Sequence, residues 1–484
     1  MSANTKEHRE VTRKLFYALL VLFAMLPVPL GGSIDWFWML ATAFTYLLMA
    51  IWLLNYSTGR VRLTDAFIRA RPVLYLFAIW LAWNLLQMLP IPINWLQSIA
   101  PLSAQSWQQA IPDIMTASIT IDSYATREEL IKGSAYALIF ALILLLVDSP
   151  GRVRVLGLWL IAVSVIVALV ASVMALTGNQ FIYTDSFVHR NFPYYSTMAH
   201  GTFMNPNQLA AYLVMNISLG IGLLLSTMKE GGSHSWREWF RNMAMTLLSR
   251  KIRLRIYLAI LVITLVLTRS RMGNVSFFLS LFLAGGLSLA LMRKSPRPVV
   301  ILLTSLLIID LMILGSWFGM DRLQEKFKLL ETETVAMDTR TNTVTRIDTN
   351  LYGFEIYKDA PLTGTGAGSF YAIYPSYEGW SGVPMFIQHA HNDYLEFLTD
   401  TGWIGILMLG AIVTMSFFAA LRALRTRRHP LMRGMAFTAV MGILYVILHS
   451  AADFFLRVPA NAALFMVILA MGWISLAMKV ERRE

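Results

Sequence analysis

Hydrophobic positions along this chain form long uninterrupted runs rather than the short periodic stripes of a soluble protein. A membrane-spanning helix needs about twenty mostly apolar residues, and runs of about this length occur twelve times. The predicted spans are 15–31, 36–54, 73–90, 131–147, 153–176, 208–228, 254–268, 274–292, 298–318, 402–421, 434–451 and 459–478. The pattern therefore predicts an all-α polytopic membrane protein in which residues 1–484 form one membrane domain.

The first run could also be a signal peptide, because Lys14 precedes its apolar core. No small-x-small cleavage site follows Pro29 and Gly31, however, and a signal peptide ends in such a site. We therefore predict a helix that stays part of the protein.

Composition agrees with a membrane location. Hydrophobic residues make up 57% of the chain and charged residues only 14%, whereas soluble domains carry roughly a quarter charged residues. So few charges cannot cover this hydrophobic content in water, which leaves the lipid bilayer as its surroundings. The absence of cysteine excludes disulfides, thiolate metal sites and cysteine nucleophiles.

The basic residues test the predicted topology. With the N-terminus in the cytoplasm, the inside segments hold 28 of the 40 lysines and arginines. These segments are 1–14, 55–72, 148–154, 229–255, 293–297, 422–433 and 479–484. Cytoplasmic loops carry such an excess, so both termini are predicted to be cytoplasmic. The net charge of +12 then reflects topology and contact with anionic lipid headgroups, not binding to nucleic acid.

Three outside segments are long enough to carry function. Residues 91–130 and 177–207 are medium loops, and residues 319–401 form one large loop between the ninth and tenth spans. Loops of that length are usually functional.

Asp310 stands alone in the ninth span, where either a functional role or a hydrogen bond to a neighbouring helix would account for it.

Two arginines interrupt the apolar stretch 256–291. A single helix of that length would run about 54 Å, longer than a bilayer is thick, so the chain is predicted to turn near Gly273 and Asn274. Arg269 and Arg271 would then lie at or slightly below the outer surface of the membrane. They are either snorkelling side chains at a helix end or a guanidinium fork that holds a phosphate of a lipid-linked ligand.

The segment 346–370 combines a predicted helix with a run of glycines. Residues 346–358 predict an amphipathic helix that ends at 359–361 and places Arg346 in its first turn. An arginine there opposes the helix dipole, which indicates a role other than helix stability. The glycines of 364–368 lack the preceding strand that a nucleotide-binding motif requires, so they predict a sharp, closely packed turn.

Residues 389–398 place two histidines beside carboxylates. The spacing of His391 and the two following leucines predicts a short helix that leads into the next span. His389 and His391 would point to different faces of it, although a metal pair with Asp393 or Glu396 stays open. A structural histidine is the default for either residue, whereas a histidine beside carboxylates also serves as a general base.

Two further groups complete the candidate chemistry. Asn205 and Pro206 form an N-cap and first-turn pair for the sixth span, and Asn207 is a candidate for lining an outer cavity. Ionisable residues at the outer end of the eleventh span are candidates for contacting and orienting the residues that bind the substrate. These are His449, Asp453 and Arg457.

Taken together, four ordered motifs resemble the O-antigen ligase and polymerase family of bacterial envelope enzymes. They are Gly-Thr-Phe-x-Asn-x-Asn at 201–207, Ser-Arg at 270–271, Arg346 upstream of Pro-Leu-x-Gly-x-Gly-x-Gly-x-Phe at 361–370, and His-x-His-Asn-x-Tyr-Leu-x-x-Leu at 389–398. The resemblance implies a GT-C-like helical scaffold and metal-independent, inverting glycosyl transfer without a cofactor. It places the protein in the bacterial inner membrane, with the active site on the periplasmic side.

The resemblance also implies substrates and residue roles. The donor would be a glycan on undecaprenyl diphosphate, and the acceptor either lipid A-core or a lipid-linked glycan. His391 matches the histidine proposed as the base, and Arg271 and Arg346 match the arginines that bind the diphosphate. His389 and Arg269 lie next to them. Further candidates for lining the cavity are Asn205, Asn207, Asn392 and Glu396.

Two alternatives remain at this point. A ligase and a polymerase share the donor chemistry and differ in the acceptor, which nothing in the sequence specifies. A transporter also fits twelve spans with both termini inside, but it predicts repeat symmetry and paired charges deep in the bundle. The sequence shows no clear internal repeat, and its ionisable groups gather on one outer face.

Overall fold

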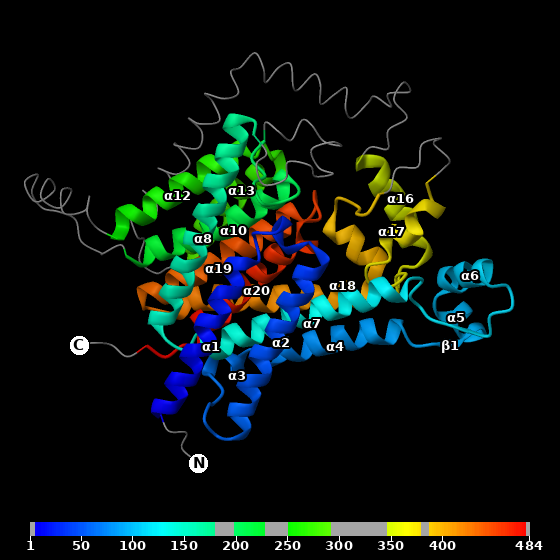
Figure 1. Cartoon of the computed structure of the whole chain (residues 1–484), viewed down its shortest axis with the longest axis horizontal. Helices are drawn as coiled ribbons and strands as arrows, with labels where there is room; N and C mark the ends of the chain where they lie inside the picture. The colour runs from blue at the N-terminus through cyan, green and yellow to red at the C-terminus, as the bar shows by residue number, and fades with distance from the viewer. Residues whose placement is uncertain (1–4, 180–197, 228–249, 292–345, 379–386, 481–484) are drawn as a thin grey trace, which may run out of the picture.

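The computed structural model describes residues 5–179, 198–227, 250–291, 346–378 and 387–480, most of which lie in helices (Figure 1). The longer helices are α1 (Thr5–Met25), α2 (Asp35–Ser57), α4 (Arg71–Gln87), α7 (Ser123–Leu146), α8 (Pro150–Thr177), α10 (Pro206–Ser226), α12 (Arg250–Leu267), α13 (Arg271–Leu291), α16 (Arg346–Asp359), α18 (Asp393–Thr426), α19 (Pro430–His449) and α20 (Pro459–Ala477). The shorter elements are η1 (Leu30–Gly32), α3 (Asp65–Arg69), β1 (Ile91–Pro92), α5 (Ile93–Ile99), α6 (Pro101–Ala110), β2 (Thr116–Ala117), α17 (Phe370–Ile373), η3 (Tyr374–Ser376) and η4 (Phe455–Arg457). The described residues thus form the predicted all-α fold.

Eight helices in the described part of the chain are long and apolar enough to cross a membrane. They are α2, α7, α8, α10, α13, α18, α19 and α20. The first, third and seventh predicted spans fall on α1, α4 and α12, and the ninth span with Asp310 lies outside the described residues. The chain is therefore a polytopic membrane protein.

The predicted end of the first span was wrong. Helix α1 begins at Thr5, before the predicted start of the span at 15, and ends at Met25, not at residue 31. Pro27 and Pro29 follow directly, and the residue before a proline is held away from the helical conformation. The prolines therefore end the helix although the apolar run continues.

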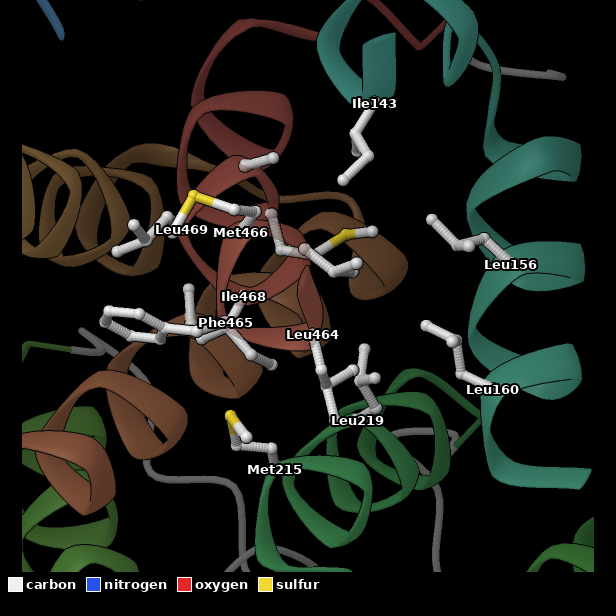
Figure 2. Close-up of a cluster of buried hydrophobic side chains, with 14 of the residues drawn as sticks. Ile143, Leu156, Leu160, Met215, Leu219, Leu464, Phe465, Met466, Ile468 and Leu469 are labelled. Carbon is white, nitrogen blue, oxygen red and sulfur yellow. The ribbon is translucent and has the colours of Figure 1, made fainter. Parts of the chain in front are cut away.

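Helices α10 and α20 form the centre of the bundle. Helix α10 packs against α8, α12 and α19, and α20 packs against α7, α18 and α19. Figure 2 shows part of the resulting core, in which Ile143 of α7, Leu160 of α8, Met215 of α10 and Leu464 of α20 face one another. Both central helices are buried almost all round, as expected for spans enclosed by other spans.

Two glycines allow a close contact between α10 and α19. A Cβ atom on Gly222 of α10 would collide with the carbonyl oxygen of Gly434 in α19, and the reverse substitution would collide in the same way. Small residues let helix backbones approach closely inside a membrane. Thr438 strengthens this contact by donating a hydrogen bond to the carbonyl oxygen of Ser218, at 2.9 Å.

Several predicted cytoplasmic segments meet at one end of the bundle. Arg152 donates to Thr12 at 2.9 Å, Lys479 lies 3.0 Å from Asp65, and Arg427 donates to the carbonyl oxygen of Met478. These contacts join segment 1–14 to 148–154, segment 55–72 to 479–484, and segment 422–433 to the residue before 479–484. Thr64 also donates to the carbonyl oxygen of Leu144, at 2.6 Å, which brings segment 55–72 close to the start of 148–154. These five basic segments therefore share one end, which is what a common side of the membrane requires.

The opposite end carries the short elements. Figure 1 shows α4, α7 and α18 running side by side toward α5, α6, α16 and α17. Strands β1 and β2 pair antiparallel there, with Ile91 opposite Ala117 and Pro92 opposite Thr116. Within the predicted loop 319–401, the described residues form α16, α17, η3 and the first turns of α18.

Candidate active site

The two histidines lie in the extended segment that leads into α18. The helix starts at Asp393, because the side chain of Asn392 caps it by accepting a hydrogen bond from the Leu395 N–H at 3.2 Å. The predicted helix is thus confirmed, but the prediction that it includes His389 and His391 was wrong. Both rings instead contact Phe454: His389 stacks on it with ring centroids 4.3 Å apart, and His391 meets it edge-on at 4.9 Å.

His391 has a strained backbone. Its φ angle is +53°, in the left-handed region that residues with a Cβ rarely adopt. Leu30 and Arg269 are the other non-glycine residues with positive φ in the described part of the chain. Such strain costs about 1–3 kcal/mol per residue and clusters at functional sites. Two of these three residues, Arg269 and His391, are predicted site residues.

Glu396 links His389 to a buried arginine. Its Oε1 atom lies 2.8 Å from Nδ1 of His389 and 3.0 Å from Nε of Arg457. The second carboxylate oxygen, Oε2, accepts a hydrogen bond from the backbone N–H of Ala390 at 3.0 Å. One carboxylate therefore orients the histidine segment and pairs with the arginine.

Arg457 pairs with three carboxylates and is largely buried. It contacts Glu129 of α7 at 2.8 Å, Glu396 as above, and Asp400, while its guanidinium lies 4.6 Å from the centre of the Phe397 ring. Burial alone would lower the pKa of Arg457, but Glu396, Glu129 and Asp400 together raise it above its usual value. The arginine is therefore permanently charged and joins α7, α18 and η4.

The glycine-rich segment completes this network. Helix α18 is broken at Gly402, where φ is +63° and ψ is −170°. The backbone N–H groups of Thr365 and Gly366 donate to the freed carbonyl oxygens of Thr399 and Asp400, at 2.8 and 2.9 Å. The prediction of a closely packed turn is confirmed, because the segment satisfies the backbone of a broken helix.

Asp400 is held on both sides. Its carboxylate accepts hydrogen bonds from the backbone N–H groups of Gly368 and Phe370, at 2.9 and 3.1 Å, and from Arg457.

The predicted helix over 346–358 is confirmed as α16, which packs on the start of α18 where Gly353 faces Leu395. Arg346 is the first described residue of α16, and its side chain lies outside the described part of the structure.

The amino end of α10 adjoins the histidines. Asn205 caps this helix by accepting from the Asn207 N–H at 2.8 Å, which confirms the predicted cap. The Asn207 side chain donates to the carboxylate of Asp453, the residue next to Phe454. His449 is buried, and its Nδ1 atom lies 2.7 Å from the Tyr445 hydroxyl.

Arg269 lies on the turn between α12 and α13, and Arg271 is the first residue of α13. The turn occupies Thr268–Ser270, three residues before the predicted position. Gly273 is already in the first turn of α13, where a Cβ atom would lie 2.9 Å from Ala210 of α10. That glycine thus serves close packing on α10, and both arginine side chains are exposed.

A cavity of about 470 Å³ lies between α7, α10, α17, α18 and η4. His389, Glu396, Phe454 and Arg457 are among the residues that line it. A second, mainly apolar cavity of about 350 Å³ extends along α4, α7, α18, α19 and α20. Both are lined by Glu129, Lys132 and Arg457, so the charged network separates a polar space from an apolar one.

Sequence reasoning missed most of this network. Glu129, Asp400 and Gln208 were not singled out, and Arg457 was only a supporting candidate. One signal was present: Arg457 is among the 12 basic residues that the topology leaves unexplained. Of the four candidates for lining the cavity, Glu396 lies in its wall, whereas Asn205 and Asn392 cap helices and Asn207 is bonded to Asp453.

Part of the chain matches a known protein family. Residues 256–410 match a family model described as O-antigen ligase, which confirms the resemblance drawn from the motifs. The matched region contains the arginine turn, α16, the glycine-rich segment and both histidines, but neither the amino end of α10 nor Arg457. No curated protein matches the chain.

Proposed function

We propose that this protein belongs to the O-antigen ligase family and is a membrane glycosyltransferase that moves a glycan from undecaprenyl diphosphate to a sugar hydroxyl. The reaction takes place on the periplasmic side of the bacterial inner membrane, on a GT-C-like scaffold of twelve spans with both termini in the cytoplasm. The family match and the apolar helices support an enzyme of this general kind. The basic segments gathered at one end of the bundle support the orientation.

One observation carries this proposal: motifs far apart in the sequence converge at the other end of the bundle. Arg269 and Arg271 lie just before Gly273, which packs on Ala210 of α10. Asn207 at the amino end of α10 donates a hydrogen bond to Asp453, and the neighbouring Phe454 contacts both histidines. Cationic side chains and candidate bases are thereby held around one helix end.

Each group has a role in the proposed displacement. The acceptor oxygen forms a bond to the anomeric carbon of the donor while the bond from that carbon to the diphosphate breaks. Arg271 and Arg346, with Arg269 beside them, stabilise the negative charge on the departing undecaprenyl diphosphate. His391 takes the proton of the acceptor hydroxyl, and its strained backbone is consistent with a position fixed for function.

His389 supports the same step from inside the cavity. Glu396 engages its Nδ1 atom at 2.8 Å, which leaves Nε2 as the atom for a substrate hydroxyl. We propose that His389 binds and orients the acceptor next to His391. No metal ion or other cofactor takes part, since the arginines supply the positive charge that the leaving group needs.

The purified protein in lipid vesicles tests this function directly. Radiolabelled undecaprenyl-diphosphate glycan is supplied with lipid A-core or with unlabelled lipid-linked glycan, and products are separated by size and by lipid anchor. Label on lipid A-core identifies a ligase, and lengthened chains on undecaprenyl diphosphate identify a polymerase. Label that crosses the vesicle membrane without a new glycosidic bond would contradict the proposal and identify a transporter.

A further inference from the structure

The polar cavity has lining residues that the proposed reaction does not use. They are Asp35 at the start of α2 and Glu128, Glu129 and Lys132 of α7. Lys132 lies 2.5 Å from Glu128 and 4.7 Å from the centre of the Trp38 ring. The volume of the polar cavity, about 470 Å³, falls within the range of about 300–1,000 Å³ that is usual for small-molecule sites.

The charge of this cavity is wrong for a phosphate. Four carboxylates line it, from Asp35, Glu128, Glu129 and Glu396, against the two permanent cations Lys132 and Arg457. Both cations are already paired with these acids or with Asp400. A diphosphate placed here would meet a surplus of negative charge in a partly buried site, where like charges repel strongly.

The remaining lining suits a ring that carries hydroxyl groups. Carboxylates accept hydrogen bonds from hydroxyls, and Phe370, Tyr371 and Phe454 offer apolar ring faces. Gln208 of α10 also lines the cavity and is only 4% exposed. Its side-chain oxygen accepts no hydrogen bond from the described residues, and a buried polar atom of that kind usually has a partner.

We propose that this cavity is the subsite for the acceptor sugar, and that it selects an uncharged or amino-bearing ring. The inference rests on the proposed function, since it assigns one of the two substrates of that reaction to a place. The donor sugar is bonded directly to the diphosphate, so the surplus of acidic groups disfavours it here. The acceptor brings only hydroxyl or amino groups to the reacting end, and His389 in the wall meets one of its hydroxyls.

The test separates acceptor binding from donor binding. In Glu128→Gln, the carboxylate that faces the cavity becomes a neutral amide of the same size. The Michaelis constant for the acceptor should rise about tenfold, the loss expected for one hydrogen bond to a charged group, while that for the donor stays within about twofold. Gln208→Leu should act in the same direction.

Glu355→Gln is the matched control. Glu355 also pairs with a lysine, Lys358 at 2.8 Å, but on the exposed face of α16 and outside the cavity lining. This variant should leave both Michaelis constants unchanged. A rise in the donor constant alone for Glu128→Gln, or no change in either constant, would overturn the assignment of the acceptor subsite.

Direct binding distinguishes failure of the subsite from failure of the proposed function. Saturation-transfer NMR on the full chain in detergent would use methyl glucoside and methyl glucosaminide as probes, with inorganic diphosphate as competitor. Both sugars should give signals in the wild-type protein, stronger for the amino sugar, that weaken in Glu128→Gln and persist with diphosphate. Absent wild-type signals, signals unchanged by the substitution, or displacement by diphosphate would overturn the subsite even if glycan transfer is observed.

Discussion

Arginines occur in two contrasting settings around the candidate site. Arg457 is buried between α7, α18 and η4 and pairs with three carboxylates. Arg269 and Arg271 are exposed at the turn between α12 and α13, where the φ angle of Arg269 is +53°. The charge of Arg457 is neutralised by ion pairs that connect the elements lining the cavity, whereas the charges of Arg269 and Arg271 are at the surface. The same residue type therefore serves structure in one region and, by our proposal, ligand binding in the other.

The largest expected effect is that of removing His391, the proposed base. His391→Ala should lower glycan transfer by about 10²–10⁴-fold, the contribution of a general base, while the protein stays folded and inserted. Initial rates with purified donor and acceptor measure this effect. His429→Ala, at the start of α19 near the opposite end of the bundle, is the control and should transfer normally. Near-normal transfer by His391→Ala would refute its assignment as the base.

Removal of the buried cation tests the structural half of the comparison. Arg457→Met leaves Glu129, Glu396 and Asp400 without their shared partner, and breaking a buried ion pair costs about 3–5 kcal/mol. The free energy of unfolding in detergent should fall by about that amount. Lys358→Met removes an exposed pair with Glu355 and should cost about 0–1 kcal/mol. Equal losses in both variants would show that the network does not stabilise the fold.

The exposed half of the comparison predicts a smaller, functional effect. Arg271→Lys keeps the charge but loses the planar fork that grips a phosphate through two hydrogen bonds. We expect about a tenfold rise in the Michaelis constant for the donor and unchanged thermal stability. Arg425→Lys, exposed near the basic end of α18, serves as the control. Full activity in Arg271→Lys would favour a snorkelling side chain over a phosphate ligand.

The sequence predicted what depends on neighbouring residues. The Asn205 cap, the end of α16 and the packed glycine turn all follow from local chemistry, and the structure contains each of them. The Arg457 network joins residues up to 328 positions apart, and only the packing of α7 against the carboxyl-terminal helices brings them together. No local pattern carries that information. The misplaced turn at 268–270 has a similar cause, because Gly273 is needed for contact with α10 rather than for turning the chain.

The smallest expected effect is from metal removal. Two carboxylates of the Arg457 network are engaged: Glu396 binds Arg457 and the Ala390 N–H, and Asp400 binds Arg457 and two further N–H groups. Recruiting either acid to a metal ion would leave the buried Arg457 short of partners, which is costly. Transfer measured after dialysis against EDTA should therefore stay within about twofold of the untreated rate. Loss of activity that added Mg²⁺ or Mn²⁺ restores would mean that a metal ion, and not the exposed arginines, carries the charge of the leaving group.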